Sequence, residues 1–423
     1  MSESIIPSAS GRLKQENWFD KLAKSGVLKQ LGQIEYGSLT IEDGSTVHEF
    51  GQHHETYPSV SIKVASQRFY SALAFGGSVG AGESYIYGDW SCSDLTSLVR
   101  LLLINRDVLD NMDSSFSRIK VPVFKMLHWL NKNTRDGSRR NIAAHYDLGN
   151  DFFRLFLDKN MMYSSCVYPT VSSDLEQASD YKLDMICQKL HLSENDHVLE
   201  IGTGWGGFAI HAARHYGCKV TTTTISKEQY DLAEQRVNEA GLSDKITLLL
   251  QDYRDLTGQY DKLVSIEMIE AIGHHYLDTY FKKCDQLLKP DGVMLLQAIT
   301  IADQRYDEAL KEIDFIKRYI FPGCFIPSNT AMQNAITKST SFKMTSLEDI
   351  GPHYARTLKD WRLRFFDAIE EVRSQGYSEA FIKMWEFYLC YCEGGFEERV
   401  IGDVQLVLSK PHNRDPHWLG MPG

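Results

Sequence analysis

A strand that ends in a glycine-rich turn is the feature that most constrains this chain. Residues 198–207 read Val-Leu-Glu-Ile-Gly-Thr-Gly-Trp-Gly-Gly, and the segment 208–213 that follows predicts a helix. Glycines at such a turn let backbone N–H groups and the helix N-terminus approach a polar ligand closely. The segment therefore predicts a ligand-binding unit of an α/β fold. The glycines alone do not identify the ligand, because Gly202, Gly204 and Gly207 also satisfy the dinucleotide pattern G-x-G-x-x-G.

Two neighbouring features favour S-adenosylmethionine over a dinucleotide. Glu200 lies near the end of the predicted strand 197–201, where its carboxylate would repel a pyrophosphate but suit the ammonium of a methionyl group. The next predicted strand, 219–224, ends without the acidic residue that a dinucleotide ribose usually contacts. A tight turn that binds nothing is the plain alternative.

Composition narrows the class of protein. The 423 residues are enough for two domains, and the net charge of −11 argues against general affinity for nucleic acid. Eight cysteines without a C-x-x-C pair predict reduced thiols and no metal site. The N-terminus lacks a secretory pattern and the chain lacks an apolar run of about 18 residues, so we expect a cytoplasmic protein that does not span a membrane.

The chain divides into three parts by pattern. Residues 1–117 predict a small α+β domain, with alternating strand-like runs at 38–41 and 60–64 and a helical pattern at 95–109. Residues 141–423 alternate helices and strands, with strands expected at 197–201, 219–224, 246–251, 262–267, 292–298 and 404–410. That alternation predicts a doubly wound α/β sheet. Helical segments at 302–320 and 328–337 interrupt this alternation before the last strand. They would lie beyond the carboxyl ends of the strands, where a lid over a ligand is expected.

The part between them, residues 118–140, is a basic linker. Its apolar residues Val123, Met126, Leu127 and Leu130 have helical spacing, with Trp129 beside them. One acidic residue, Asp136, stands against the basic residues Arg118, Lys120, Lys125, Lys132, Arg135, Arg139 and Arg140. Such a helix can lie in a lipid headgroup layer, so the linker predicts peripheral association with an anionic membrane surface. Packing of the apolar stripe on the protein itself explains the pattern equally well.

Taken in order, several motifs resemble the cyclopropane-fatty-acyl-phospholipid synthase family of S-adenosylmethionine-dependent methyltransferases. The resemblance runs from about residue 36 to 410, and its motifs besides the glycine turn are 76–85, 88–90, 145–153, 162–164, 251–256 and 318–322. It implies a Rossmann-like class I methyltransferase sheet and transfer of a methyl or methylene group to the cis double bond of a phospholipid acyl chain, giving a cyclopropane. It leaves open whether the chain forms a homodimer.

The resemblance also implies roles for individual residues. Residues that match the family's cofactor site are Tyr163, Ser164, Glu200, Gly202, Thr203, Gly204, Gly206, Thr224, Ile225, Gln229, Asp252, Tyr253 and Arg254. Thr224, Ile225 and Gln229 would bind the ribose hydroxyls, and 252–254 would frame the adenine. Residues that match the substrate and lid region are His145, Tyr146 and Phe321. For Ser226, capping of the following helix is the alternative interpretation.

In the resembled family a bicarbonate ion removes a proton from the transferred methyl. The matching residues here are Glu270, Tyr319, Gln297, Ser165 and Ile299, the last through its backbone, and Cys392 matches a cysteine suspected of catalysis. Three positions depart from the family pattern: Gln297 and Ala271 replace histidines and Ser165 replaces a cysteine. An amide can donate to an anion but cannot titrate. The product could therefore be a methyl or methylene lipid. The chain could also be a small-molecule N-methyltransferase or a non-catalytic lipid-binding protein.

Overall fold

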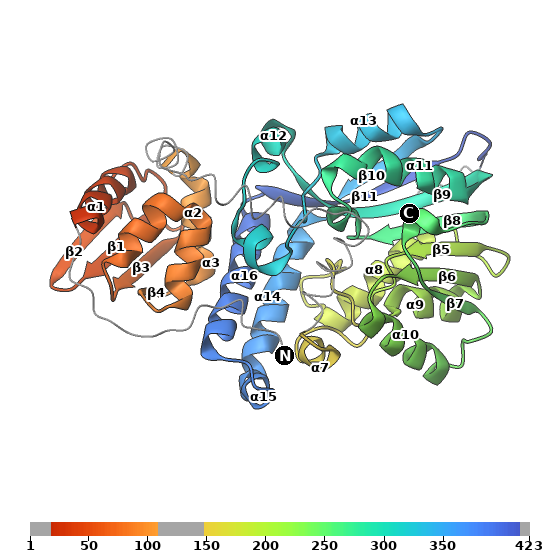
Figure 1. Cartoon of the computed structure of the whole chain (residues 1–423), viewed down its shortest axis with the longest axis horizontal. Coiled ribbons are helices and arrows are strands. Elements are labelled where there is room, and N and C mark those ends of the chain that lie inside the picture. The colour runs from red at the N-terminus through yellow and green to blue at the C-terminus, as the bar shows by residue number, and fades with distance from the viewer. Residues whose placement is uncertain (1–17, 109–147, 415–423) are drawn as a thin grey trace. The chain divides into compact units, whose positions relative to one another are not determined.

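The computed structural model describes residues 18–108 and 148–414, whose contacts divide them into two compact units (Figure 1). The first unit comprises the N-terminal part of the chain together with 313–320 and 369–398. The second comprises the rest of the chain up to residue 312, then 321–368 and the C-terminal part from 399. The predicted basic linker, 118–140, lies outside the described residues.

The first unit is a small α+β domain, as the N-terminal pattern predicts. Its sheet has the order β2-β1-β3-β4, formed by β1 (Ser38–Asp43), β2 (Thr46–Gly51), β3 (Ser59–Val64) and β4 (Trp90–Cys92). The helices near it in sequence are α1 (Trp18–Leu31), α2 (Arg68–Ile86) and α3 (Leu95–Ile104). Late segments of the chain complete this unit: a π-helical turn (Ile316–Ile320), α15 (Ile369–Ser374) and α16 (Glu379–Glu397).

Close packing explains why α16 belongs to this unit. A Cβ atom on Gly394 would lie 2.7 Å from the Val99 side chain of α3, so the glycine lets the two helices approach. The Thr96 hydroxyl donates to the Glu393 carboxylate across the same contact, at 3.2 Å. The sequence pattern placed 302–320 in one helical insertion of the α/β part, whereas 313–320 packs with the first unit. A lid role for the insertion stays a prediction.

The second unit contains a seven-stranded sheet of order β10-β11-β9-β8-β5-β6-β7. All neighbours are parallel except where β11 runs antiparallel to β9 and β10. The order reverses between β5 and β8, which makes the sheet doubly wound, as predicted. Its strands are β5 (His197–Ile201), β6 (Lys219–Thr224), β7 (Ile246–Leu250), β8 (Tyr260–Ile266), β9 (Leu288–Ile301), β10 (Lys343–Asp349) and β11 (Ile401–Ser409).

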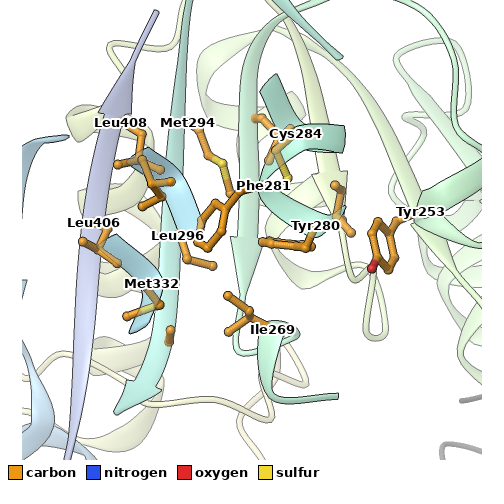
Figure 2. Close-up of a cluster of buried hydrophobic side chains, with 14 of the residues drawn as sticks. Tyr253, Ile269, Tyr280, Phe281, Cys284, Met294, Leu296, Met332, Leu406 and Leu408 are labelled. Atoms are coloured by element: carbon orange, nitrogen blue, oxygen red, sulfur yellow. The ribbon is translucent and has the colours of Figure 1, made fainter. Parts of the chain in front are cut away.

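Helices cover both faces of this sheet. On one face α11 (Leu277–Leu287) and α13 (Asn329–Ser339) bury a cluster in which Tyr280 and Phe281 lie against Met294 and Leu296 (Figure 2). On the other face the core is closed by α8 (Leu175–Lys189), α9 (Gly207–Tyr216) and α10 (Lys227–Glu239). Further helices of the unit are α7 (Asn150–Arg154), α12 (Tyr306–Ala309) and α14 (Gly351–Asp367).

Side chains that alternate along each strand pack into the two cores, one on each face of the sheet. Leu199 joins the α11 side, whereas its neighbour Val198 joins the α9 side, and Leu263 and Val264 divide in the same way. Strands buried on both faces read as continuous apolar runs, which is why the sequence predicts them well. The polar residues of the site gather at the carboxyl edge of this sheet, the usual ligand-binding edge of an open α/β sheet. No helix within 18–108 or 148–414 is long and apolar enough to cross a membrane.

Candidate active site

The glycine turn joins β5 to α9 at the point where the strand order reverses. Gly202, Gly204 and Gly206 have φ values of 103°, 52° and 83°, which favour glycine. The N–H groups of Gly202 and Thr203 both donate to the Thr223 carbonyl at 3.0 Å, so they hold the turn against β6. A Cβ atom on Gly204 would meet no protein atom within 4 Å, whereas one on Gly207 would lie 2.5 Å from the Asn160 carbonyl oxygen. The turn is therefore open at Gly204 and closed by packing at Gly207.

Glu200 lies beneath this turn, near the end of β5. The residue is 2% exposed, and its Oε2 accepts a 2.6 Å hydrogen bond from the Thr222 hydroxyl of β6. Burial raises the pKa of Glu200 to about 8, although the Thr222 bond and the positive charge of Lys182 oppose the rise. A ligand ammonium within reach would favour the charged carboxylate. Open space at Gly204 and a buried carboxyl nearby fit the methionyl part of S-adenosylmethionine.

The end of β6 presents a small hydrogen-bonded group. The Thr224 hydroxyl donates to Gln229 Oε1 at 3.0 Å, and Ser226 caps α10 by accepting from the Gln229 N–H at 3.2 Å. The capping interpretation of Ser226 is thus correct. Thr224 and Gln229 orient one another next to Ile225, and ribose binding by this group stays a prediction.

The predicted adenine-binding residues follow β7. Arg254 makes two hydrogen bonds to the Asp252 carboxylate, at 2.8 and 2.7 Å, so the acid is held in place before any ligand binds. Tyr253 is 8% exposed and packs edge-on against Tyr280, with ring centroids 5.5 Å apart. Its ring thus contributes to the apolar core of Figure 2.

Aromatic side chains surround Tyr163 in the second unit. Its ring lies within 6.4 Å, centroid to centroid, of four others: Phe153, Phe156, Phe321 and Trp361. The neighbouring Ser164 accepts a 2.8 Å hydrogen bond from Lys182, a lysine of α8 that is 0% exposed. Sequence reasoning missed Lys182, although it shares a helix face with Ala178 and Ile186, where a charged residue is unexpected.

Glu270 follows β8, and its side chain contacts the backbone of β9. Its Oε1 accepts a 2.6 Å hydrogen bond from the Ile299 N–H, which brings together two of the predicted catalytic residues. Its Oε2 is buried and has no hydrogen-bond partner among the described residues. Burial and, secondarily, the negative charge of Glu267 raise the pKa of Glu270 to about 8.

Glu267 is the residue to which the other two predicted groups bind. Its Oε1 accepts hydrogen bonds from the Ser165 N–H and from Gln297 Nε2, both at 2.8 Å. Its Oε2 accepts from the Tyr354 hydroxyl at 2.7 Å. Gln297 also donates to Asp403 Oδ2 at 3.1 Å. Sequence reasoning missed Glu267 and Asp403, and the available signal was an acidic residue directly after one buried strand and another inside the last one.

These bonds decide whether a bicarbonate ion fits. Four groups that the resemblance assigns to the ion already donate to protein carboxylates: Ser165 and Gln297 to Glu267, Ile299 to Glu270, and Tyr319 to Glu83. The expected ion therefore does not fit this arrangement of donors.

The remaining predicted residues lie elsewhere in the chain. Tyr319 belongs to the first unit, where its hydroxyl donates to the Glu83 carboxylate. Cys392 is a partly buried residue of α16, also in the first unit. His145 and Tyr146 lie outside the described residues. Catalytic or substrate-binding roles for these four residues stay predictions.

Comparison with known proteins identifies the family. A family model described as mycolic acid cyclopropane synthetase matches residues 133–406. The chain belongs to this family. Accordingly, this cyclopropane synthase family member is an S-adenosylmethionine-dependent methyltransferase.

Similar proteins agree with this family. The chain is 39% identical to tuberculostearic acid methyltransferase UfaA1 of Mycobacterium tuberculosis, over 78% of this chain and 79% of the relative. It is 38% identical to cyclopropane-fatty-acyl-phospholipid synthase of Escherichia coli, over 82% and 87%. It also resembles the crystal structure of mycolic acid cyclopropane synthase CmaA1 complexed with SAH and CTAB, with a TM-score of 0.60 and 30% identity over 64% of this chain and 98% of the other.

The open space at Gly204 yields a prediction with a matched control. We expect Gly204→Ala to weaken S-adenosylhomocysteine binding about tenfold or more, because the new methyl group would enter the ligand's space, whereas Gly241→Ala leaves binding unchanged. Both glycines have positive φ and neither Cβ would meet a protein atom, so both variants carry similar backbone strain, roughly 1–2 kcal/mol. Calorimetric titration measures the affinities. Equal affinities in the two variants would contradict the site.

The raised pKa of Glu200 predicts that ligand binding releases protons. At pH 7 a carboxyl group with a pKa of about 8 is mostly protonated, and a bound ammonium lowers that pKa, so the proton leaves. Titrations of S-adenosylhomocysteine in buffers with different ionisation heats count the released protons. We expect release at pH 7 that fades by about pH 9 and is reduced in Glu200→Gln. Undiminished release in that variant would assign the proton to another group.

Proposed function

We propose that this enzyme methylates the cis double bond of a phospholipid acyl chain and that loss of a proton then closes a cyclopropane ring. The observation that carries the proposal is the group of carboxyl side chains at the carboxyl edge of β8 and β9, beside the β5 glycine turn, in a member of this family. The similarity to the phospholipid synthase of Escherichia coli supports the substrate class.

The described residues suit the demands of this chemistry. An isolated alkene is a weak nucleophile, so the reacting groups must be held in line and water kept away from the cation that forms. S-adenosylmethionine, when bound at the glycine turn, supplies the electrophilic methyl group. The aromatic group around Tyr163 offers apolar surface and ring faces that favour a cation. Carboxyl groups with raised pKa values can accept a proton near neutral pH.

A methylene or methyl lipid is the second candidate product. The same methyl transfer followed by proton loss gives a methylene group if the cation first moves to the methylated carbon. The 39% identity to a tuberculostearic acid methyltransferase and the departures at Gln297 and Ala271 favour this alternative. Likeness to coclaurine N-methyltransferase, at 19% identity, extends to the fold alone and gives no support to N-methylation.

Lipid turnover tests the proposed function directly. We expect vesicles of dioleoyl phosphatidylglycerol, incubated with the enzyme and S-adenosylmethionine, to gain the mass of one CH2 group per modified chain, while dipalmitoyl vesicles gain nothing. Proton magnetic resonance then separates a cyclopropane ring from a methylene group. Methylation of small amines without any lipid product would contradict the proposal and favour an N-methyltransferase.

We also propose that the enzyme acts from the cytoplasm as a peripheral membrane protein, through the basic linker. Changing Lys125, Lys132, Arg139 and Arg140 to Gln should weaken binding to anionic vesicles by about 1 kcal/mol per charge near the surface. Sedimentation with vesicles at low and high salt measures the effect. Changing the exposed acidic residue Glu194 to Gln serves as a control. Equal binding of the charge variant and the wild type at low salt would make the linker a simple connector.

A further inference from the structure

We propose that the carboxylate of Glu267 is the proton acceptor of this enzyme, in the place that the resembled family gives to a bicarbonate ion. The inference deepens the proposed function and rests on it for the step in which the proton is lost. It predicts an enzyme that needs no external anion.

The backbone at Glu267 is the first observation. The residue follows the last residue of β8 with φ = 46°, in the left-handed region that non-glycine residues seldom adopt. Such conformations cost of order 1–3 kcal/mol and persist where the surroundings hold them, often at functional sites. Here the surroundings are three donors from three parts of the chain: the Ser165 N–H, the Gln297 amide of β9 and the Tyr354 hydroxyl of α14.

The identity of those donors is the second observation. Ser165 and Gln297 occupy positions that the resemblance assigns to the bound ion, and both bind the same oxygen of Glu267. A carboxylate has the O–C–O geometry of bicarbonate, so it can use the same donors. The Glu267 side chain thus supplies the anion from within the protein.

Charge near Glu267 is the third observation. Asp403 is 0% exposed, and a hydrogen bond between its side chain and that of Glu267 helps to raise its pKa. Burial and the charge of Glu267 raise the pKa values of both Asp403 and Glu270. The nearby cation is Lys182, whose charge lowers the pKa of Glu267 against the larger effect of burial. An added bicarbonate ion would find the Ser165 and Gln297 donors already bound to Glu267, so its entry is unfavourable.

Atoms and charge balance in the proposed step. A C–H bond of the transferred methyl group breaks, and its electron pair forms the new C–C bond that closes the ring, or the C=C bond of a methylene product. The proton passes to a Glu267 oxygen, and the positive charge on the lipid is neutralised. The hydrogen bonds from Ser165, Gln297 and Tyr354 favour the charged form of Glu267, against the burial that raises its pKa. Release of the proton to water restores the carboxylate for the next turnover.

A bicarbonate-binding measurement tests, without any lipid substrate, whether the Glu267 carboxylate takes the place of the ion. Magnetic resonance of ¹³C-labelled bicarbonate should show no saturable binding to the wild-type enzyme. Glu267→Gly removes the carboxylate at a backbone position that suits glycine and frees the Ser165 and Gln297 donors, so this variant should bind the ion. Saturable binding to the wild type with the same affinity as to Glu267→Gly would overturn the proposal, whatever the lipid product is.

Turnover on dioleoyl phosphatidylglycerol vesicles tests the catalytic role. Wild-type turnover should be the same in bicarbonate-depleted buffer and after bicarbonate is restored. Glu267→Gln, which cannot accept the proton, should lose about 10²–10⁴-fold in turnover while S-adenosylhomocysteine binding is kept. In bicarbonate-depleted buffer, Glu267→Gly should be as slow as Glu267→Gln. Added bicarbonate should restore its turnover, and a merely structural role of Glu267 would not produce this rescue. The exposed control Glu194→Gln should match the wild type.

The outcomes separate the two proposals. Loss of wild-type turnover on bicarbonate depletion, near-normal turnover of Glu267→Gln, or a folded Glu267→Gly enzyme that bicarbonate does not rescue would each overturn the role of Glu267. A wild-type enzyme that methylates no unsaturated lipid would instead overturn the proposed function, and ion binding would still decide whether Glu267 replaces the anion.

Discussion

Burial of both faces of the seven-stranded sheet is the constraint on which the rest of the second unit depends. Apolar or hydrogen-bonded side chains are favoured inside such a sheet, because an unpaired buried polar group costs about 1–3 kcal/mol. Gln297 and Gln405 satisfy this requirement together: they are register partners on β9 and β11, and Gln405 Nε2 donates to Gln297 Oε1 at 3.0 Å. Lys189 then donates to Gln405 Oε1 at 2.6 Å. The polar chain so formed leads through the sheet to Glu267.

Buried negative charge is concentrated where the strands end. Glu200, Glu267, Glu270 and Asp403 all have pKa values raised chiefly by burial. Carboxyl groups in such surroundings are stronger bases than exposed ones and respond strongly to a nearby cation. The sulfonium cofactor and the carbocation are both positively charged. Buried carboxyl groups with raised pKa values therefore suit both the methyl transfer and the loss of the proton.

Several parts of the molecule were predictable from local patterns. The strand, the positive-φ glycines and the helix of 197–216 follow from apolar runs and glycine spacing, and the predicted strands of the sheet overlap those observed. The edge strand β10 was missed, because it is amphipathic and mostly exposed and carries Lys343, Glu348 and Asp349. The placement of 313–320 and of α16 in the first unit was also missed, since packing between segments far apart in sequence decides it.

The sequence by itself determined the strands of the sheet other than β10, the glycine turn and the cofactor class, because these depend on residues that are neighbours in the chain. Only the tertiary structure decided which acidic residue accepts the hydrogen bonds of the Ser165 and Gln297 donors. Ser165 and Glu267 are 102 positions apart, Gln297 and Asp403 are 106 apart, and Tyr354 reaches Glu267 across 87. A hydrogen bond requires atoms about 3 Å apart, and only the folded sheet brings these distant residues to that distance. The same folding makes Glu267 part of the site, because its carboxyl group binds both the Ser165 and the Gln297 donors.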